Sequence, residues 1–330
     1  MQFRLTRMVA LVAGLAVATM ATSACGKYSL SSIRSLKAFK DGLTFYQKGD
    51  YRGATAKFEE SISHNADFGF SYFYLANSYD NQYRSARRGE AENDALLPKA
   101  AENYRLAIDK LAEPAATDPQ AAEFRKRSFE FLIALYGSDK LDDFSRAEPV
   151  AKELIQFQPN DAANYQLLAR LYEDQGDFEQ AEAMFRQAIE VRPTDALGYQ
   201  LIAGFYNRQF EFDKLMDALQ KRAELEPNNP EAWHTMGTYY YDKVYRDTAV
   251  PREQGIEYLQ RGVEAEDRAL ALNQDYVDAV RYKELLIRLR ASKERDRAVI
   301  NKLVAEADAL ADRVEEIESR QAGDAAQTAS

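Results

Sequence analysis

Few side chains in this sequence could bind a metal or attack a substrate. The chain has one cysteine, Cys25, and two histidines, His64 and His234, which lie far apart in the sequence. They do not have the spacing of a zinc site, and the sequence lacks an HExxH motif, a glycine-rich phosphate loop, a nucleophile elbow and an EF-hand loop. Carboxylates are abundant, but the solvent faces of helices ordinarily carry them, so no two stand out as an acid–base pair. We therefore predict no catalytic residue, no metal site and no cofactor, and a protein that is not an enzyme.

The elements that position the other side chains are indicated by residues that recur every 34 positions. One unit combines aromatic, large aliphatic and small residues and ends in proline: Tyr165, Leu168, Ala169, Tyr172, Gly176, Ala181, Phe185, Ala188 and Pro193. Matching residues follow 34 positions later at Tyr199, Ile202, Ala203, Tyr206 and Pro227, and 34 positions later again at Trp233, Met236, Gly237 and Tyr240. This period and this order of residue types are those of the tetratricopeptide repeat, and the chain resembles that family over roughly residues 35–275.

Each repeat is predicted to form two antiparallel helices. In the clearest repeat, residues 163–174 place their apolar side chains on one helical face, and Asp177 is expected to cap the second helix. Pro193 ends that helix because proline cannot continue its hydrogen bonding. One helix pair cannot bury its apolar face alone, so neighbouring pairs must stack. The predicted fold is all-α, and the resemblance implies a right-handed superhelical solenoid.

The predicted solenoid covers residues 35–292, as about six repeats and a capping helix near 276–291. The second helix of the sixth repeat is expected at about 252–272. A long helix is predicted over 293–320, where an a/d pattern of apolar residues indicates either a cap on the solenoid, which we favour, or pairing with a partner helix. Residues 321–330 are small and polar and are predicted to be disordered. The a/d residues are Ile300, Leu303, Ala307, Leu310, Val314 and Ile317.

The N-terminus has the pattern of an export signal. Arg4 and Arg7 precede an uncharged stretch, so residues 1–24 are predicted to be a signal peptide and residues 25–34 a linker. The segment Thr22-Ser23-Ala24-Cys25 resembles the bacterial lipobox, which implies that Cys25 is lipidated; the alternative is an ordinary signal-peptidase junction. The glycine after Cys25 favours the outer membrane. The predicted location is the cell envelope, lipid-anchored on the periplasmic face of the outer membrane.

The charge of the chain excludes one class of partner. The formal net charge is −10, and removal of residues 1–24 takes away two arginines and no acid, which leaves −12. Nucleic acid requires a basic surface, so we predict that it is not a partner. The expected partners are a protein or peptide, and the membrane only through the lipid anchor.

The resemblance also implies which residues bind a partner. In this family the first helices line a concave face, and certain positions of each repeat point into the groove. Amides and tyrosines suit an extended peptide, although Phe39 and Phe73 have the alternative of packing between helices. Carried onto this sequence, the groove positions are Phe39, Tyr46, Phe73, Asn77, Asn81, Gln166, Arg170, Gln200, Asn207, Arg208, His234, Thr238 and Tyr241.

Two insertions provide a second candidate surface. One follows Tyr79 in the second repeat and the other follows Tyr240 in the sixth, and both combine basic and aromatic residues. They are either partner-binding loops or extensions that cover gaps in the solenoid. The basic candidates are Arg84, Arg87, Arg88, Lys243 and Arg246.

These features together predict a non-enzymatic protein–protein interaction scaffold of the bacterial cell envelope. It would bind a peptide or protein on the concave face of the solenoid. The alternative is a solute- or carbohydrate-binding component of an envelope uptake complex. A solute binder should have a closed aromatic pocket, whereas a scaffold should have an open groove.

Overall fold

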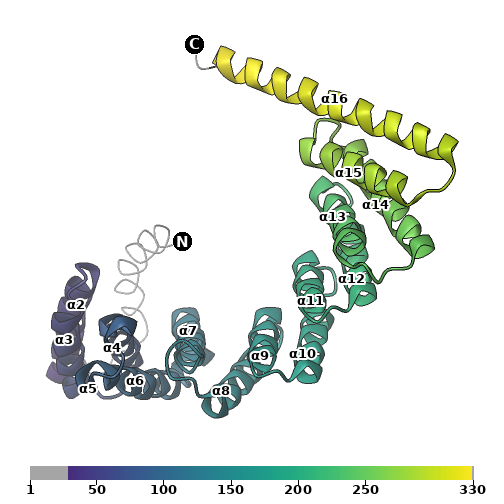
Figure 1. Ribbon diagram of the computed structural model, residues 1–330. Coiled ribbons are helices and arrows are strands. Elements are labelled where there is room, and N and C mark those ends of the chain that lie inside the picture. Colours follow the sequence, from purple (N-terminus) through teal and green to yellow (C-terminus); the bar gives the residue numbers. More distant parts are fainter. Residues whose placement is uncertain (1–28, 329–330) are drawn as a thin grey trace. The chain divides into compact units, whose positions relative to one another are not determined.

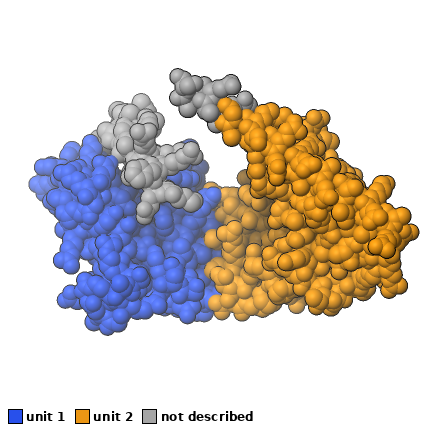
Figure 2. Space-filling view, turned by 45° about the horizontal axis from the view of Figure 1, so that its top comes forward, with its two compact units in different colours: residues 1–154 blue, residues 155–330 orange. Residues whose placement is uncertain are grey.

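The computed structural model describes residues 29–328, and in this range the chain is helical and contains no strand (Figure 1). The predicted signal peptide and Cys25 lie outside the described residues. The chain divides into two compact units, residues 1–154 and 155–330, which Figure 2 colours separately. The all-α prediction is confirmed.

The first unit consists of antiparallel helices in chain order, with an insertion between α4 and α6. Helix α2 packs on α3, α4 packs on α6, and α6 packs on α7. The helices are α2 (Leu30–Gln47), α3 (Tyr51–His64), α4 (Gly69–Gln82), α5 (Ala91–Asp94), α6 (Leu96–Lys110), α7 (Pro119–Leu135) and α8 (Phe144–Phe157), with short 3-10 turns η2 (Ser85–Arg87) and η3 (Pro114–Ala116).

The second unit continues the same arrangement and adds the two C-terminal helices. Helix pairs α9–α10, α11–α12 and α13–α14 each pack together, and α15 packs on both α13 and α14. The helices are α9 (Ala162–Asp174), α10 (Phe178–Val191), α11 (Ala196–Arg208), α12 (Phe212–Leu225), α13 (Pro230–Arg246), α14 (Arg252–Leu272), α15 (Val277–Lys293) and α16 (Arg297–Thr328).

The residues that cap the helices recur with the same 34-residue period as the core residues. Asp161, Asp195 and Asn229 are 34 residues apart, and each side chain accepts a hydrogen bond from a backbone N–H in the first turn of α9, α11 or α13. Such caps satisfy donors that the helix leaves unpaired. Asp177 likewise accepts from the backbone N–H of Gln180 at the start of α10. The period therefore includes the capping residues as well as the core.

The core has small residues where paired helices meet. Ala169 and Ala181 are fully buried, and Phe185 fills the space beside them with 2% of its surface exposed. This is the arrangement predicted from the clearest repeat. Because these alanines occupy the helix contact, a larger side chain there would overpack it.

Helix α16 packs along α15 and caps the second unit (Figure 1). Leu303, Ala307, Leu310, Val314 and Ile317 are buried in one cluster with residues of α14 and α15. The a/d pattern therefore covers the end of the solenoid, and the prediction of a cap is confirmed. Ile300 is half-buried.

Two predicted boundaries were wrong. Helix α2 begins at Leu30, inside the predicted 25–34 linker, because the Ser29 side chain caps it by accepting from the Ser32 N–H. Helix α16 runs to Thr328, through most of the segment predicted to be disordered from residue 321. That segment is rich in alanine and glutamine, which propagate an existing helix at little cost. Within residues 29–328, none of the helices combines the length and the apolar character needed to cross a membrane.

Candidate functional site

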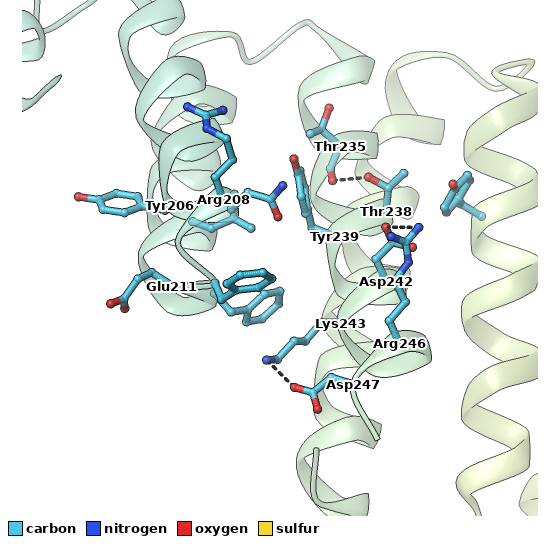
Figure 3. Close-up of a pocket in the computed structure, with 15 residues that line it drawn as sticks. Tyr206, Arg208, Glu211, Thr235, Thr238, Tyr239, Asp242, Lys243, Arg246 and Asp247 are labelled. Carbon is cyan, nitrogen blue, oxygen red and sulfur yellow. Dashed lines mark hydrogen bonds and ion pairs between the residues drawn. The ribbon is translucent and has the colours of Figure 1, made fainter. Parts of the chain in front are cut away.

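A groove in the second unit is the candidate partner site. It is open to solvent, has a volume of about 1120 Å³, and lies between the α11–α12 turn and helix α13 (Figure 3). Tyr282 from α15 also contributes to its wall. The remaining lining residues are Tyr206, Asn207, Arg208, Phe210, Glu211, Phe212, Leu215, Thr235, Thr238, Tyr239, Asp242, Lys243, Arg246 and Asp247.

One face of α13 forms a wall of this groove. Thr235, Tyr239, Asp242 and Arg246 are spaced by three or four residues, so they share a face of the helix. The Thr238 hydroxyl donates to the Thr235 carbonyl oxygen at 2.7 Å (Figure 3). This face is polar because the apolar residues of α13, including Met236 and Tyr240, are buried on the other side.

The cations in the groove are already neutralised within the chain. Lys243 Nζ lies 2.9 Å from an Asp247 oxygen, and Arg246 lies 3.3 Å from an Asp242 oxygen (Figure 3). Arg208 forms two hydrogen bonds to the Glu173 carboxylate, at 2.6 and 2.9 Å. The groove therefore does not present a basic surface.

Asn207 is the polar group best placed to bind a peptide backbone. Its side chain is exposed at the end of α11, and it has no hydrogen bond to any residue of the described range 29–328. A primary amide both donates and accepts hydrogen bonds. An extended peptide needs both functions from a groove.

Phe210 is the most exposed large apolar residue at the groove, with 92% of its surface accessible. Its backbone is left-handed, with φ of 59°. The equivalent turns of other repeats have Gly49, Asp142 or Gly176 at this position, with φ of 77°, 52° and 78°. Glycine and aspartate tolerate this conformation, whereas for a bulky residue it is an outlier. The 34-residue register contained this signal, because Phe210 replaces the glycine of the preceding repeat, but the prediction missed it.

The structure brings the two predicted surfaces together in this unit. Asn207, Arg208 and Thr238 come from the predicted groove set, and Lys243 and Arg246 come from the predicted insertion set. The second insertion is not a loop, because α13 runs on to Arg246 and includes both basic residues. The prediction also missed Glu211, Tyr239, Asp242 and Tyr282, which lie at positions that the repeat pattern does not mark.

Three further predicted residues of this unit do not line the groove. Gln166 on α9 is half-buried, and Arg170 on α9 and Gln200 on α11 are exposed. None of the three belongs to the lining of the groove beside α13. Their role in binding stays a prediction.

His234 was predicted to face a partner, but its side chain contacts a buried residue of the core. Its Nδ1 lies 3.0 Å from Oε1 of Glu266, a residue of α14 that is completely buried. Burial raises the pKa of the Glu266 carboxyl from 4.5 to about 7, and the hydrogen bond to His234 opposes this shift. Gly237 makes room for the carboxylate, because a Cβ there would lie 2.2 Å from Glu266 Oε1. His234 therefore joins α13 to α14.

Tyr241 was also placed in the groove set, and it packs instead against other aromatic rings. Its ring stacks on Tyr245 at 5.3 Å and meets the edge of Tyr282 at 5.9 Å. It also packs against a buried cluster of α13, α14 and α15 side chains. Tyr241 is half-buried, and its main contacts are within the solenoid.

The predicted groove of the first unit is filled by an aromatic cluster. Phe73 and Asn77 are buried, with 5% and 7% of their surfaces exposed, because α7 places the Phe124 ring 4.9 Å from Phe73. Tyr46 donates to Asn77 Oδ1 at 3.4 Å, and the Asn77 amide donates to the Phe73 carbonyl oxygen. Phe73 and Asn77 are therefore core residues, which corrects the prediction.

Phe39 and Asn81 also make contacts within the first unit. Phe39 is half-buried against Phe58, Phe68 and Tyr74, at ring distances of 5.1 to 5.7 Å. The Asn81 amide donates to the backbone carbonyl of Asn77 at 2.8 Å. The alternative that the aromatics pack between helices describes both Phe39 and Phe73.

The first insertion is a folded connection organised by Asn93. The Asn93 side chain is buried, accepts from the Arg84 N–H and donates to the carbonyl oxygens of Arg84 and Arg87. Arg88 donates to the carbonyl oxygens of Asp139 and Lys140 at 3.0 and 2.7 Å. Arg84 donates to the Asn81 carbonyl, and Arg87 pairs with Glu90. These arginines hold the insertion in place, as the alternative of a covering segment predicts.

Comparison with known proteins finds a family match in one part of the chain. Residues 140–204 match the family model described as tetratricopeptide repeat. A search of curated proteins finds no relative of this sequence. Among solved structures, the chain is similar to the C-terminal part of a repeat-containing protein from Cytophaga hutchinsonii, with 16% identity, a TM-score of 0.49, and coverage of 82% of this chain and 95% of that one.

Two other solved structures show the same kind of likeness. A tetratricopeptide repeat protein from Parabacteroides merdae has 13% identity and a TM-score of 0.43, with coverage of 83% of this chain and 99% of that one. YrrB, described as a protein with an unusual peptide-binding site, has 14% identity and a TM-score of 0.40, with coverage of 61% and 91%. Similarities this distant say nothing about ligands. The family match identifies tetratricopeptide repeats over residues 140–204, and the helices before and after this segment are paired in the same way.

Proposed function

We propose that this protein is a non-enzymatic interaction scaffold that binds an extended segment of a peptide or protein in the groove beside α13. The observation that carries the proposal is an open groove in which the Asn207 amide is unpaired within residues 29–328 and Phe210 is exposed. Binding would combine hydrogen bonds to the partner backbone with apolar contact to its side chains.

The dimensions of the groove suit an extended segment. Its α13 wall runs from Thr235 to Asp247, which corresponds to about 18 Å of helix. An extended chain covers that distance with about five residues. Polar groups recur along this wall, at Thr235, Thr238 and Asp242, so a bound segment would meet hydrogen-bonding groups along its length.

The same groove does not favour a small solute. Sites for small molecules are enclosed and mostly apolar, with a few convergent polar groups. This groove is open, and its wall contains the ion pairs Lys243–Asp247 and Arg246–Asp242. The aromatic residues of the first unit, where a sugar would be expected to stack, are packed against one another. These features support a macromolecular partner.

The cell envelope is the proposed location. This part of the proposal depends on the sequence of residues 1–25, with a signal peptide followed by a lipobox-like segment and Cys25. Metabolic labelling with a fatty-acid analogue should mark the wild-type protein and should not mark the Cys25→Ala variant. Equal labelling of the two proteins would contradict a lipid anchor on Cys25.

Peptide binding can be tested with a pair of amide variants. Peptides selected from a random dodecapeptide display library would be titrated against the wild type, Asn207→Ala and Gln200→Ala. Both positions are exposed amides on α11, but only Asn207 lines the groove. We expect Asn207→Ala to weaken binding by about 1–3 kcal/mol and Gln200→Ala to have little effect. Selection of no peptide, or equal affinities of all three proteins, would overturn the proposal.

A further inference from the structure

The exposed Phe210 side chain does not stabilise the fold. With 92% of its surface accessible, the side chain gains almost no burial, while its left-handed backbone is unfavourable for a bulky residue. A glycine at this position would satisfy the turn, as Gly49 and Gly176 do in two other repeats. A strained backbone that displays an aromatic ring at the edge of a groove indicates a contact residue.

Phe210 lies where two clefts meet. It lines the groove beside α13, and it also lines a second cleft of about 350 Å³ that includes Pro251, Gln254 and Tyr258. Glu211, Phe212, Lys243 and Asp247 likewise belong to both linings. A segment that follows the groove toward the end of α13 would therefore pass over the Phe210 ring.

The unpaired charge around Phe210 is negative. Within residues 29–328, Glu211 and Asp213 make neither an ion pair nor a side-chain hydrogen bond, and Glu211 starts α12 without a side-chain cap. The cations that line the groove, Lys243, Arg246 and Arg208, are all paired with carboxylates of the chain. The two free carboxylates do interact favourably with the α12 dipole, but that interaction does not require an exposed ring.

We propose that the partner segment presents an arginine or lysine that stacks on the Phe210 ring and pairs with Glu211 and Asp213. The face of an aromatic ring attracts a cation, and a neighbouring carboxylate strengthens the attraction. The groove then binds the backbone on one side of this basic residue. This inference rests on the proposed function, because it specifies the chemistry of the segment that the groove binds.

The experiment selects peptides from the random dodecapeptide display library against the full chain and against its Phe210→Gly variant. We expect the wild type to enrich peptides with arginine or lysine, and the variant to lose this enrichment. The selected peptides should bind Phe210→Gly about tenfold or more weakly. Glu211→Gln combined with Asp213→Asn should also weaken binding and should remove much of its dependence on salt.

Phe178→Ala provides the matched control. Phe178 is also an exposed aromatic beside a repeat turn, as the first residue of α10, with 46% of its surface accessible, but it lines neither cleft. Its replacement should leave the affinity unchanged. Because the turn accepts glycine, Phe210→Gly should melt at the same or a higher temperature than the wild type, which separates a binding role from a structural one.

The outcomes distinguish this inference from the proposed function. If the wild type selects no peptide, both fail. If it selects peptides without basic enrichment, and they bind Phe210→Gly as tightly as the wild type, the inference fails and peptide binding in the groove stands. A fall in the melting temperature of Phe210→Gly would show that Phe210 stabilises the fold, and would also overturn the inference.

Discussion

Phe210 and Gly176 lie 34 residues apart, at the same position of successive repeats, and both have a left-handed backbone, with φ of 59° and 78°. Gly176 adopts this conformation at no steric cost, whereas a non-glycine residue there costs about 1–3 kcal/mol. A Cβ added at Gly176 would meet nothing within 4 Å, and Phe210 is 92% exposed, so the two positions differ in residue type and not in crowding. Comparing these two positions therefore measures the free-energy cost of a left-handed backbone for a bulky residue.

Exchanging the two residue types should therefore change stability in opposite directions. We expect Phe210→Gly to raise the free energy of unfolding by about 0.5–2 kcal/mol, and Gly176→Phe to lower it by about 1–3 kcal/mol. Urea unfolding of the full chain measures both values. If Phe210→Gly destabilises the protein as much as Gly176→Phe does, the Phe210 side chain makes stabilising contacts and is not strained.

The buried pair of His234 and Glu266 predicts a pH-dependent contribution to stability. Burial raises the pKa of Glu266 to about 7 in the folded protein, from 4.5 in its ordinary state, and nearby Asp267 and Asp278 add to this effect. Between these values the folded state binds more protons than the unfolded state, so the contribution is complete below pH 4.5 and is lost as the pH rises through about 7. The loss is on the order of 3 kcal/mol, since one pKa unit corresponds to about 1.4 kcal/mol.

A variant without a titrating group at this position measures the effect. Glu266→Gln keeps the size of the side chain, so the difference in unfolding free energy between wild type and variant removes the pH dependence of all other groups. This difference should move in favour of the variant as the pH rises from about 4.5 to 7. A difference that stays constant over this window would show that the pKa of Glu266 is not raised.

Asn93 is predicted to hold the first insertion in its folded form. Its side chain makes three hydrogen bonds to the backbone of Arg84 and Arg87, and the residue is 3% exposed. Asn93→Ala should cost about 1–3 kcal/mol locally, because it leaves buried backbone groups without partners. Trypsin should then cleave after Arg84 or Arg87 faster than in the wild type. Asn103→Ala is the control, since Asn103 is a half-buried amide on α6 that donates, within residues 29–328, only to the Lys99 carbonyl of its own helix. Equal cleavage rates of the three proteins would contradict the role of Asn93.

The repeat pattern predicted the helices well because capping and core residues share one period. The second helix of the sixth repeat was expected near 252–272, and α14 spans Arg252–Leu272. The pattern failed at the two ends of the solenoid, where no neighbouring repeat constrains the boundary. There, a serine cap at Ser29 and a run of good helix formers after residue 321 determined the helix ends.

The site was harder to predict. The groove positions were carried over from the family, and this transfer is valid only where every repeat stacks in the same way. Phe73 occupies a groove position but is covered by Phe124, which belongs to α7 and has no counterpart in the period. His234 is bound by Glu266, which lies 32 residues further on in α14, and no spacing rule points to that contact. Asn207 is exposed, as a groove position requires, because it lies at the end of α11; its role in binding stays a prediction.

The partner segment is expected to lie along the α13 face of the groove. Tyr239 lies on this face, and a photo-reactive phenylalanine derivative of similar shape can replace it. The same derivative at Phe178, outside the groove, and at Arg87, in the first insertion, provides the comparison. With peptides selected by the wild-type protein, we expect cross-linking from position 239 and none from 178 or 87. Cross-linking from position 87 in place of 239 would contradict this expectation and assign recognition to the insertion.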